Sequence, residues 1–98
     1  EIFYESYDEN EYSMGDNIVV SPWGDLIICE DHGHSGCRLI GMTASGSIYH
    51  IAQVSNSYSE LAGVCFSKDS KYMFVNVQDE GKTVAIYGDW SKINTLKV

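Results

Sequence analysis

A pattern of short β-branched runs joined by tight turns occurs twice along the chain, and this repeat restricts the fold more than any other feature. Residues 63–67 align with residues 17–21, and residues 72–76 correspond to the run that begins at Leu26. The two copies lie about 45 residues apart, within the range of β-propeller blades. No amphipathic helical pattern of useful length interrupts them. The sequence therefore predicts an all-β fold, a β-propeller fragment of about two four-stranded antiparallel blades.

The first copy begins with a β-hairpin. Its two apolar runs, residues 18–20 and 26–28, flank a turn at residues 21–25. Pro22 and Gly24 supply turn conformations there that a continuous strand does not accept. The hairpin returns the chain to its starting side, so polar residues at its two outer ends are expected to lie close together.

Counting the predicted strands divides the chain into unequal parts. Residues 1–15 supply one outer strand and an acidic loop, residues 16–53 a four-stranded blade, and residues 60–90 a second blade that lacks its outer strand. We therefore expect a single partial propeller domain over residues 1–98 with an open sheet edge, which is a ready site for pairing. Either residues 2–4 complete the last blade of a neighbouring copy, giving a homo-oligomer through open sheet edges, or the missing blades lie on a longer chain.

The charge of the chain limits its partners. Fourteen acidic and six basic residues give a formal net charge of -8 at pH 7. Such a chain lacks the electrostatic footprint that phosphate backbones require, so nucleic-acid binding is disfavoured. No apolar window is long enough to cross a membrane, and no N-terminal segment has the pattern of a signal peptide. The surplus carboxylates suit cation binding or solubility.

Acidic residues gather at the outer ends of the hairpin. In an up-and-down blade, the loop before the first strand and the loop between the second and third strands share a rim, which brings Asp16 near Glu30 and Asp31. Glu60 occupies the equivalent rim of the second blade, just before an innermost strand. Hard cations prefer several carboxylate and carbonyl oxygens. The pattern predicts a metal site, although acidic loop residues also serve as solvated turn formers.

The remaining chemistry-bearing residues favour structural roles. The three cysteines indicate no disulfide framework, and with the histidines of the adjoining loop they match no usual zinc spacing. Cys29 and Cys65 lie in apolar runs and are predicted to be buried, whereas Cys37 lies in a loop. Trp23 and Trp90 are predicted to pack between blades. No nucleophile elbow and no glycine-rich phosphate loop is present, so the catalytic residues stay unassigned.

Much of the chain resembles the later blades of the PhoX-type alkaline phosphatases. The resemblance lies in residues 3–5, 16–31, 38–43, 59–67, 74–78 and 85–90. Its more specific parts are Asn-Ile, Gly-Asp-Leu and Cys-Glu-Asp within residues 16–31, and Ser-Glu-Leu-Ala-Gly within residues 59–67. Members of that family are exported bacterial β-propellers that hydrolyse phosphomonoesters with calcium and ferric iron held near the central channel.

The resemblance implies a role for each candidate ligand. Glu60 corresponds to a direct metal ligand, and Glu30 or Asp31 to a ligand on the calcium side. Other ligands of the family, including a cysteine and a further glutamate, belong to earlier blades. By resemblance, the chain is a periplasmic or extracellular fragment of a metal-dependent phosphatase that acts on phosphate esters and is inactive alone. Two alternatives stay open: a non-catalytic propeller module that assembles head to tail, and a calcium-dependent lactonase-like propeller.

Overall fold

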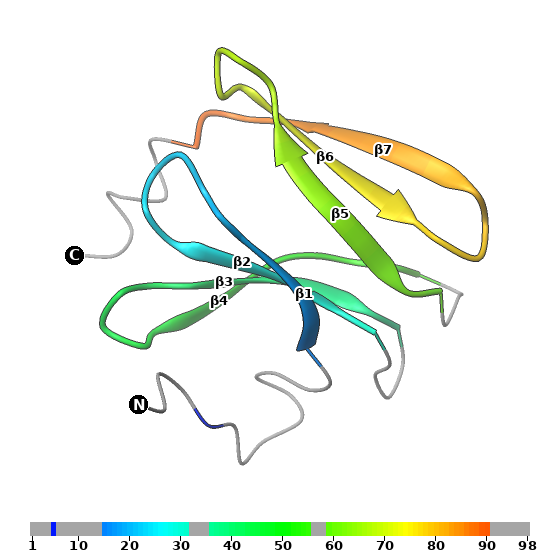
Figure 1. The fold of residues 1–98 in the computed structure, drawn as a ribbon, viewed down its shortest axis with the longest axis horizontal. Coiled ribbons are helices and arrows are strands. Elements are labelled where there is room, and N and C mark those ends of the chain that lie inside the picture. Colours follow the sequence, from blue (N-terminus) through cyan, green and yellow to red (C-terminus); the bar gives the residue numbers. More distant parts are fainter. Residues whose placement is uncertain (1–4, 6–14, 32–35, 56–58, 91–98) are drawn as a thin grey trace.

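A computed structural model describes residues 5, 15–31, 36–55 and 59–90 of the chain. Within these ranges, seven strands form two antiparallel sheets (Figure 1). The four-stranded sheet has the order β1 (Gly15–Val20), β2 (Leu26–Glu30), β3 (Arg38–Met42) and β4 (Ile48–Gln53). The three-stranded sheet has the order β5 (Leu61–Phe66), β6 (Tyr72–Val77) and β7 (Lys82–Tyr87).

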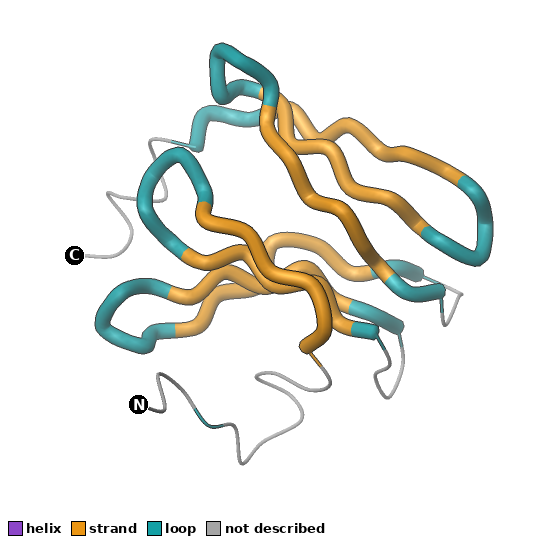
Figure 2. The backbone as a smooth tube through the Cα atoms, in the orientation of Figure 1, coloured by secondary structure: helices purple, strands orange, loops and turns teal. Residues whose placement is uncertain are grey.

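Each sheet is an up-and-down meander, and the two sheets stack on each other like adjacent propeller blades (Figure 1). The rest of the described chain is loop and turn (Figure 2), and none of it forms a helix able to span a bilayer. The all-β prediction is confirmed, and the two blades do not close a ring. The strand predicted at residues 2–4 lies outside the described residues, among which no strand pairs with the free edge of β7.

Equivalent serines close the first turn of each sheet, which supports the internal repeat. The Ser21 amide donates to the Asp25 carbonyl at 2.8 Å, and Ser21 Oγ accepts from the Asp25 amide at 3.1 Å. Ser67 makes the same pair of hydrogen bonds with Tyr72, at 2.9 and 3.0 Å. The second turn is therefore one residue longer, and Ser70 accommodates the extra residue with a φ of 62°.

The larger core cluster lies between the two sheets, and a smaller one, made of Ile28, Ile40 and Met42, lies on the other face of the first sheet. The buried residues of the larger cluster are Ile27, Cys29, Cys37, Leu39, Leu61, Val64, Met73, Val75 and Val77. Trp23 seals one end of this core, because it stacks on Trp90 with a centroid distance of 5.5 Å and meets Phe66 edge-on at 5.5 Å. Trp23 lies in the turn between β1 and β2, whereas Phe66 ends β5 and Trp90 follows β7, so the predicted packing of tryptophans between blades is confirmed.

The cysteines differ in burial. Cys29 is buried in the core as predicted, and Cys37 is buried at the end of the loop that precedes β3. Cys65 is exposed, so the prediction that it is buried is wrong. Successive residues of a strand point to opposite faces, and Val64 takes the side of β5 that faces the core. Cys65 therefore lies on the outer face of the second sheet.

Candidate metal site on the carboxylate rim

Three of the four predicted metal ligands converge on one rim of the molecule. Asp16 lies near the start of β1, Asp31 follows the end of β2, and Glu60 precedes β5. One carboxylate oxygen from each lies within 4.8 Å of the other two. Asp16 is exposed, whereas Asp31 and Glu60 are half-buried. This carboxylate cluster joins the two sheets at the rim where β1 and β5 begin, in the lower part of Figure 1.

A β-bulge places Asp16 in the cluster. Gly15 pairs with Glu30, and Asn17 pairs with Cys29, so Asp16 is an extra residue on its strand. The extra residue of a bulge leaves the regular ladder, and its side chain takes a direction that the strand alone would not give. The bulge thus accounts for an acidic residue that turns toward the neighbouring sheet.

Hydrogen bonds from the β6–β7 turn hold Glu60. Its carbonyl accepts from the Gln78 amide N–H at 2.9 Å. With its side-chain nitrogen turned toward the glutamate, Gln78 also donates to both carboxylate oxygens at 3.3 Å. The preceding residue, Ser59, is buried, and its Oγ accepts from the Asp79 amide at 2.8 Å. These contacts position both the backbone and the carboxylate of Glu60.

A hydrogen bond between β1 and β5 links the two sides of the cluster. The Gly63 amide donates to Asn17 Oδ1 at 3.2 Å. Gly63 lies in a second bulge with a φ of 68°, and a Cβ at this position would come 2.8 Å from Asn76 Nδ2. Glycine is therefore suited to this position. Because Asn17 follows Asp16 directly, the bond fixes Asp16 relative to the strand that begins beside Glu60.

Glu30, the fourth predicted ligand, binds Arg38 below the rim and does not join the cluster. Its Oε1 accepts from Arg38 Nε at 2.8 Å and from the Arg38 amide at 2.9 Å, and its Oε2 accepts from Arg38 Nη2 at 2.8 Å. The side chain of Glu30 is fully buried, and that of Arg38 is 5% exposed. A bidentate pair of this kind uses both carboxylate oxygens. We therefore leave Glu30 out of the ligand set.

Two buried thiols lie near the cluster. Burial raises the pKa of Cys29 to about 11, and the negative charge of Glu60 adds to this effect. Burial also raises the pKa of Cys37, with further contributions from Glu30 and Asp31. The Cys37 thiol donates to the Asp31 carbonyl at 2.8 Å. Metals bind thiolates and not thiols, and these cysteines are protonated at neutral pH. The donors of the cluster are therefore its carboxylate oxygens.

Comparison with known families identifies the family to which the chain belongs. A family model described as alkaline phosphatase PhoX matches residues 2–81. The chain belongs to the PhoX family. The match includes all three cluster residues and ends before β7. No curated protein and no solved structure matches the chain significantly.

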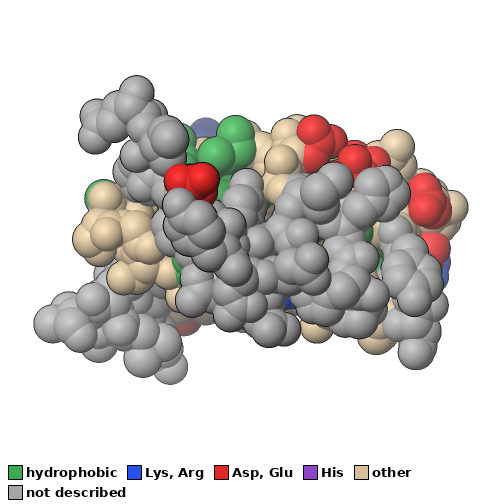
Figure 3. Space-filling view, turned by 90° about the horizontal axis from the view of Figure 1, so that it is seen from below, with side chains coloured by type: hydrophobic (Ala, Val, Ile, Leu, Met, Phe, Trp, Pro, Cys, Tyr) green, Lys and Arg blue, Asp and Glu red, His purple; other side chains and the backbone are tan. Residues whose placement is uncertain are grey.

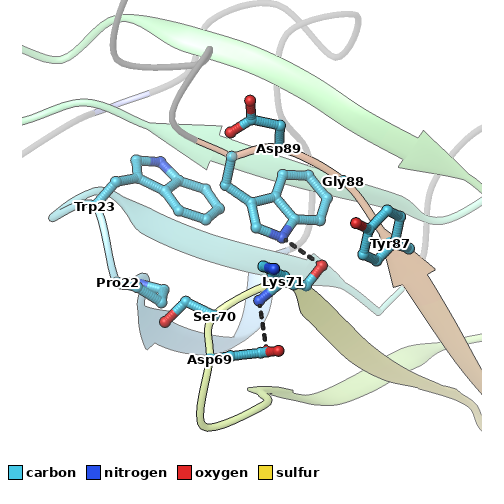
Figure 4. A pocket seen from close by; sticks show the side chains of 9 residues that line it. Pro22, Trp23, Asp69, Ser70, Lys71, Tyr87, Gly88 and Asp89 are labelled. Atoms are coloured by element: carbon cyan, nitrogen blue, oxygen red, sulfur yellow. Dashed lines mark hydrogen bonds between the residues drawn. The ribbon is translucent and has the colours of Figure 1, made fainter.

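The opposite rim of this PhoX-family chain carries a cleft that the sequence did not predict. The cleft has a volume of about 650 Å³ and is lined in part by Trp23, Lys71, Tyr87 and Trp90 (Figure 4). Trp90 Nε1 donates to the Lys71 carbonyl at 3.2 Å, which holds the ring over the β5–β6 turn. The two tryptophans were the only signal in the sequence for this surface. The family match ends at residue 81, before four of the residues that line the cleft: Tyr87, Gly88, Asp89 and Trp90.

Proposed function

We propose that this chain is part of a PhoX-type phosphomonoesterase and that its carboxylate cluster contributes ligands to the metal site. One observation carries this proposal: carboxylates from both sheets lie within 4.8 Å of one another in a chain that matches the PhoX family. Three like charges repel at such distances, and a bound cation reverses this repulsion. The net charge of -8, with acidic side chains spread along the face in Figure 3, favours cations further.

The donor set suits calcium. Asp16, Asp31 and Glu60 each offer two carboxylate oxygens, and calcium is bound by carboxylates and carbonyls in flexible geometry. The two thiols nearby are protonated at neutral pH because burial raises the pKa of both Cys29 and Cys37. We therefore assign calcium to the cluster. Ferric iron, which the resemblance also implies, would depend mainly on ligands from other blades.

A cation at this rim would bind phosphate oxygens of a phosphate monoester and stabilise the charge that develops during hydrolysis. The role of this chain is to hold that cation. Asp16, Asp31 and Glu60 supply the oxygens, and Gln78 orients Glu60. Because other family ligands belong to other blades, we expect the 98-residue chain to bind calcium without turning over a phosphate ester.

Two further proposals follow from the family and the open sheet. We propose that the protein acts in the periplasm or outside the cell, because members of the family are typically exported. We also propose that the free edge of β7 receives an outer strand, supplied by residues 2–4 of a neighbouring copy or by a further blade of a longer chain.

Calcium titration by calorimetry tests the metal site. Glu60→Gln removes one charge at nearly constant shape, so we expect the affinity for calcium to fall by at least about tenfold. Glu80→Gln is the matched control, because Glu80 is an exposed carboxylate paired with Lys82 at 3.2 Å, and it should leave the affinity unchanged. Equal affinities for wild type and Glu60→Gln would reject the assignment.

Turnover assays separate the proposed activity from its alternatives. A chromogenic phosphate ester, supplied with calcium and iron, should be hydrolysed only when the missing blades are present. Lactone opening with calcium alone would instead favour the lactonase-like alternative. Phosphatase activity from the pure 98-residue chain would show that this chain holds a complete site and would overturn the expected division between blades.

A further inference from the structure

We propose that the cleft on the rim opposite the carboxylate cluster binds a neutral saccharide, with a sugar ring packed on the tryptophans and sugar hydroxyls bonded to the β5–β6 turn. The volume of the cleft, about 650 Å³, is within the range of small-molecule sites. Three segments line it: the β1–β2 turn, the β5–β6 turn and the end of β7 with the residues after it. Because the cleft lies on the other rim, this binding does not depend on the phosphatase proposal.

Two indole rings form a fixed wall of the cleft. Trp23 and Trp90 stack with 5.5 Å between their centroids and an angle of 20° between their planes. Trp23 Nε1 donates to Tyr49 Oη at 2.9 Å and to Asp25 Oδ2 at 3.0 Å. Trp90 Nε1 donates to the Lys71 carbonyl. Both N–H groups are thus used within the chain, and both residues are only half-buried, so the rings meet a ligand through their carbon atoms.

The β5–β6 turn holds a carboxylate with one available oxygen. Asp69 Oδ1 accepts from Ser67 Oγ at 2.6 Å and from the Lys71 amide at 3.1 Å, the latter drawn in Figure 4. These bonds, that from Ser67 above all, lower the pKa of Asp69, so its side chain is ionised at neutral pH. Asp69 Oδ2 makes no hydrogen bond to any described residue. The turn therefore presents an oriented acceptor to a ligand hydroxyl.

The backbone of Ser70 supports a role for this turn in binding. Ser70 has a φ of 62°, and no other described residue except glycine has a positive φ. Glycine adopts this left-handed conformation at lower energy, and positions strained in this way cluster at binding sites. The Ser70 hydroxyl lines the cleft beside Asp69 (Figure 4) and makes no hydrogen bond within the described ranges. A ligand that uses the hydroxyl accounts for a serine where glycine would suit the backbone better.

The charges that line the cleft favour a neutral ligand that both donates and accepts. Asp69 supplies an acceptor, and the Lys71 ammonium, which forms no ion pair with a described residue, supplies donors. Lys71 would repel a cation, whereas Asp69 and the net charge of -8 would repel an anion. A hydroxyl can accept from an ammonium and donate to a carboxylate. Adjacent hydroxyls of a sugar therefore satisfy both groups at once.

The shape of a sugar ring matches the indole wall. When every hydroxyl of a pyranose is equatorial, as in β-linked glucose, both faces of the ring carry only C–H groups, which pack on aromatic rings as apolar surface. A proline-rich peptide would also pack on tryptophans, but proline has no N–H to donate to Asp69. The ligand class that fits the cleft best is a neutral β-glucoside.

Tryptophan fluorescence of the full chain tests the proposal, because both tryptophans of the sequence line the cleft. Cellobiose, a neutral β-linked glucose disaccharide, should shift the emission in a saturable way. Sorbitol is the control probe, since it carries hydroxyls but has no ring to pack on the indoles, and it should give no saturable shift. The proposal would be overturned if cellobiose gave no saturable shift or if sorbitol bound equally well. Binding of a proline-rich peptide but not of cellobiose would also overturn it.

Two conservative variants separate sugar binding from folding. Asp69→Asn keeps Oδ1 for the turn and replaces Oδ2 by a donor, whereas Ser70→Gly removes the hydroxyl and relieves the positive φ. Each should weaken cellobiose binding by about threefold to tenfold, because each removes one hydrogen bond to the ligand. In urea, Ser70→Gly should be at least as stable as wild type, so its loss of affinity would not be a loss of folding.

Lys68→Gln is the matched control, since Lys68 is an exposed residue of the same turn that does not line the cleft. This variant should bind cellobiose as tightly as wild type. Wild-type affinity in both Asp69→Asn and Ser70→Gly would contradict the site, and so would an equal loss of affinity in Lys68→Gln.

Discussion

Glu30 and Asp31 are neighbours in the sequence, but they belong to two regions that use carboxylates in opposite ways. Glu30 is buried, and both of its oxygens accept hydrogen bonds from Arg38 at 2.8 to 2.9 Å. Asp31 lies on the rim, where its carboxylate meets those of Asp16 and Glu60 within 4.8 Å. The ion pair places opposite charges together, whereas the cluster places like charges together. The first arrangement favours the folded state, and the second favours a cation.

Breaking the ion pair should have the largest effect. Arg38→Met leaves the Glu30 carboxylate buried without its guanidinium partner, so we expect the free energy of unfolding to fall by about 3–5 kcal/mol. Replacing both residues, as Glu30→Met with Arg38→Met, should recover much of that loss because no buried charge is left. Urea denaturation measures all three proteins. A loss below about 1 kcal/mol for Arg38→Met would contradict a structural role for the pair.

The surface pair between Lys82 and Glu80 is the control for this experiment. Its atoms lie 3.2 Å apart, but the two side chains are 67% and 38% exposed. Exposed pairs contribute about 0–1 kcal/mol because water screens their charges. Lys82→Met should therefore cost less than about 1 kcal/mol, which would attribute the Arg38 effect to burial and not to the loss of a positive charge.

Removing a charge from the cluster should change the stability of the protein by a smaller amount, and the sign of the change should depend on calcium. Glu60→Gln relieves repulsion among three carboxylates, so without metal the variant should be more stable than wild type by about 0.5–1 kcal/mol. With calcium, wild type gains more from binding, and the order should reverse. Thermal melts with calcium and with a chelator measure both states. If Glu60→Gln is less stable than wild type both with calcium and with a chelator, then Glu60 has a structural role like that of Glu30.

The sequence was sufficient for the fold because each blade is specified locally. The apolar runs, the turn residues and their repetition identify strands without reference to distant contacts. The rim was also predictable, since a hairpin brings its own ends together and thereby places Asp31 near Asp16. Glu60 joins Asp16 and Asp31 because of the way the two sheets stack. The sequence predicted only that Glu60 occupies the equivalent position on the neighbouring blade.

The sequence did not reveal that Asp31 joins the cluster whereas Glu30 pairs with Arg38. It depends on the bulge at Asp16, which shifts the register at the end of the hairpin, and on Arg38, which lies across the next loop. The exposure of Cys65 was missed for a related reason. An apolar run does not reveal which of its residues face an existing neighbour and which face a surface that the described residues leave exposed.

The buried Cys29 thiol makes the stability of the protein depend on pH in the alkaline range. Burial raises the pKa of Cys29 from 9.0 to about 11, so the folded protein holds this proton more tightly than the unfolded chain. The resulting stabilisation is complete below about pH 9 and is lost as the pH rises toward 11. The free energy of unfolding of wild type should therefore decline over this interval more steeply than that of Cys29→Ala.

Cys65→Ala is the matched control for this decline, because Cys65 is exposed and its removal should leave the wild-type slope in place. Denaturant unfolding at intervals between pH 8 and pH 11 measures the three slopes, over the range that the raised pKa defines.

Repeating the measurement with calcium tests whether the cation binds near the Cys29 thiol. A cation bound beside Glu60 offsets part of the negative charge that raises the pKa of Cys29 in the folded protein, so with calcium the decline should still begin near pH 9 but should be smaller and end at a lower pH. A decline of the same size with and without calcium would separate the thiol from the cluster and would contradict cation binding at Glu60.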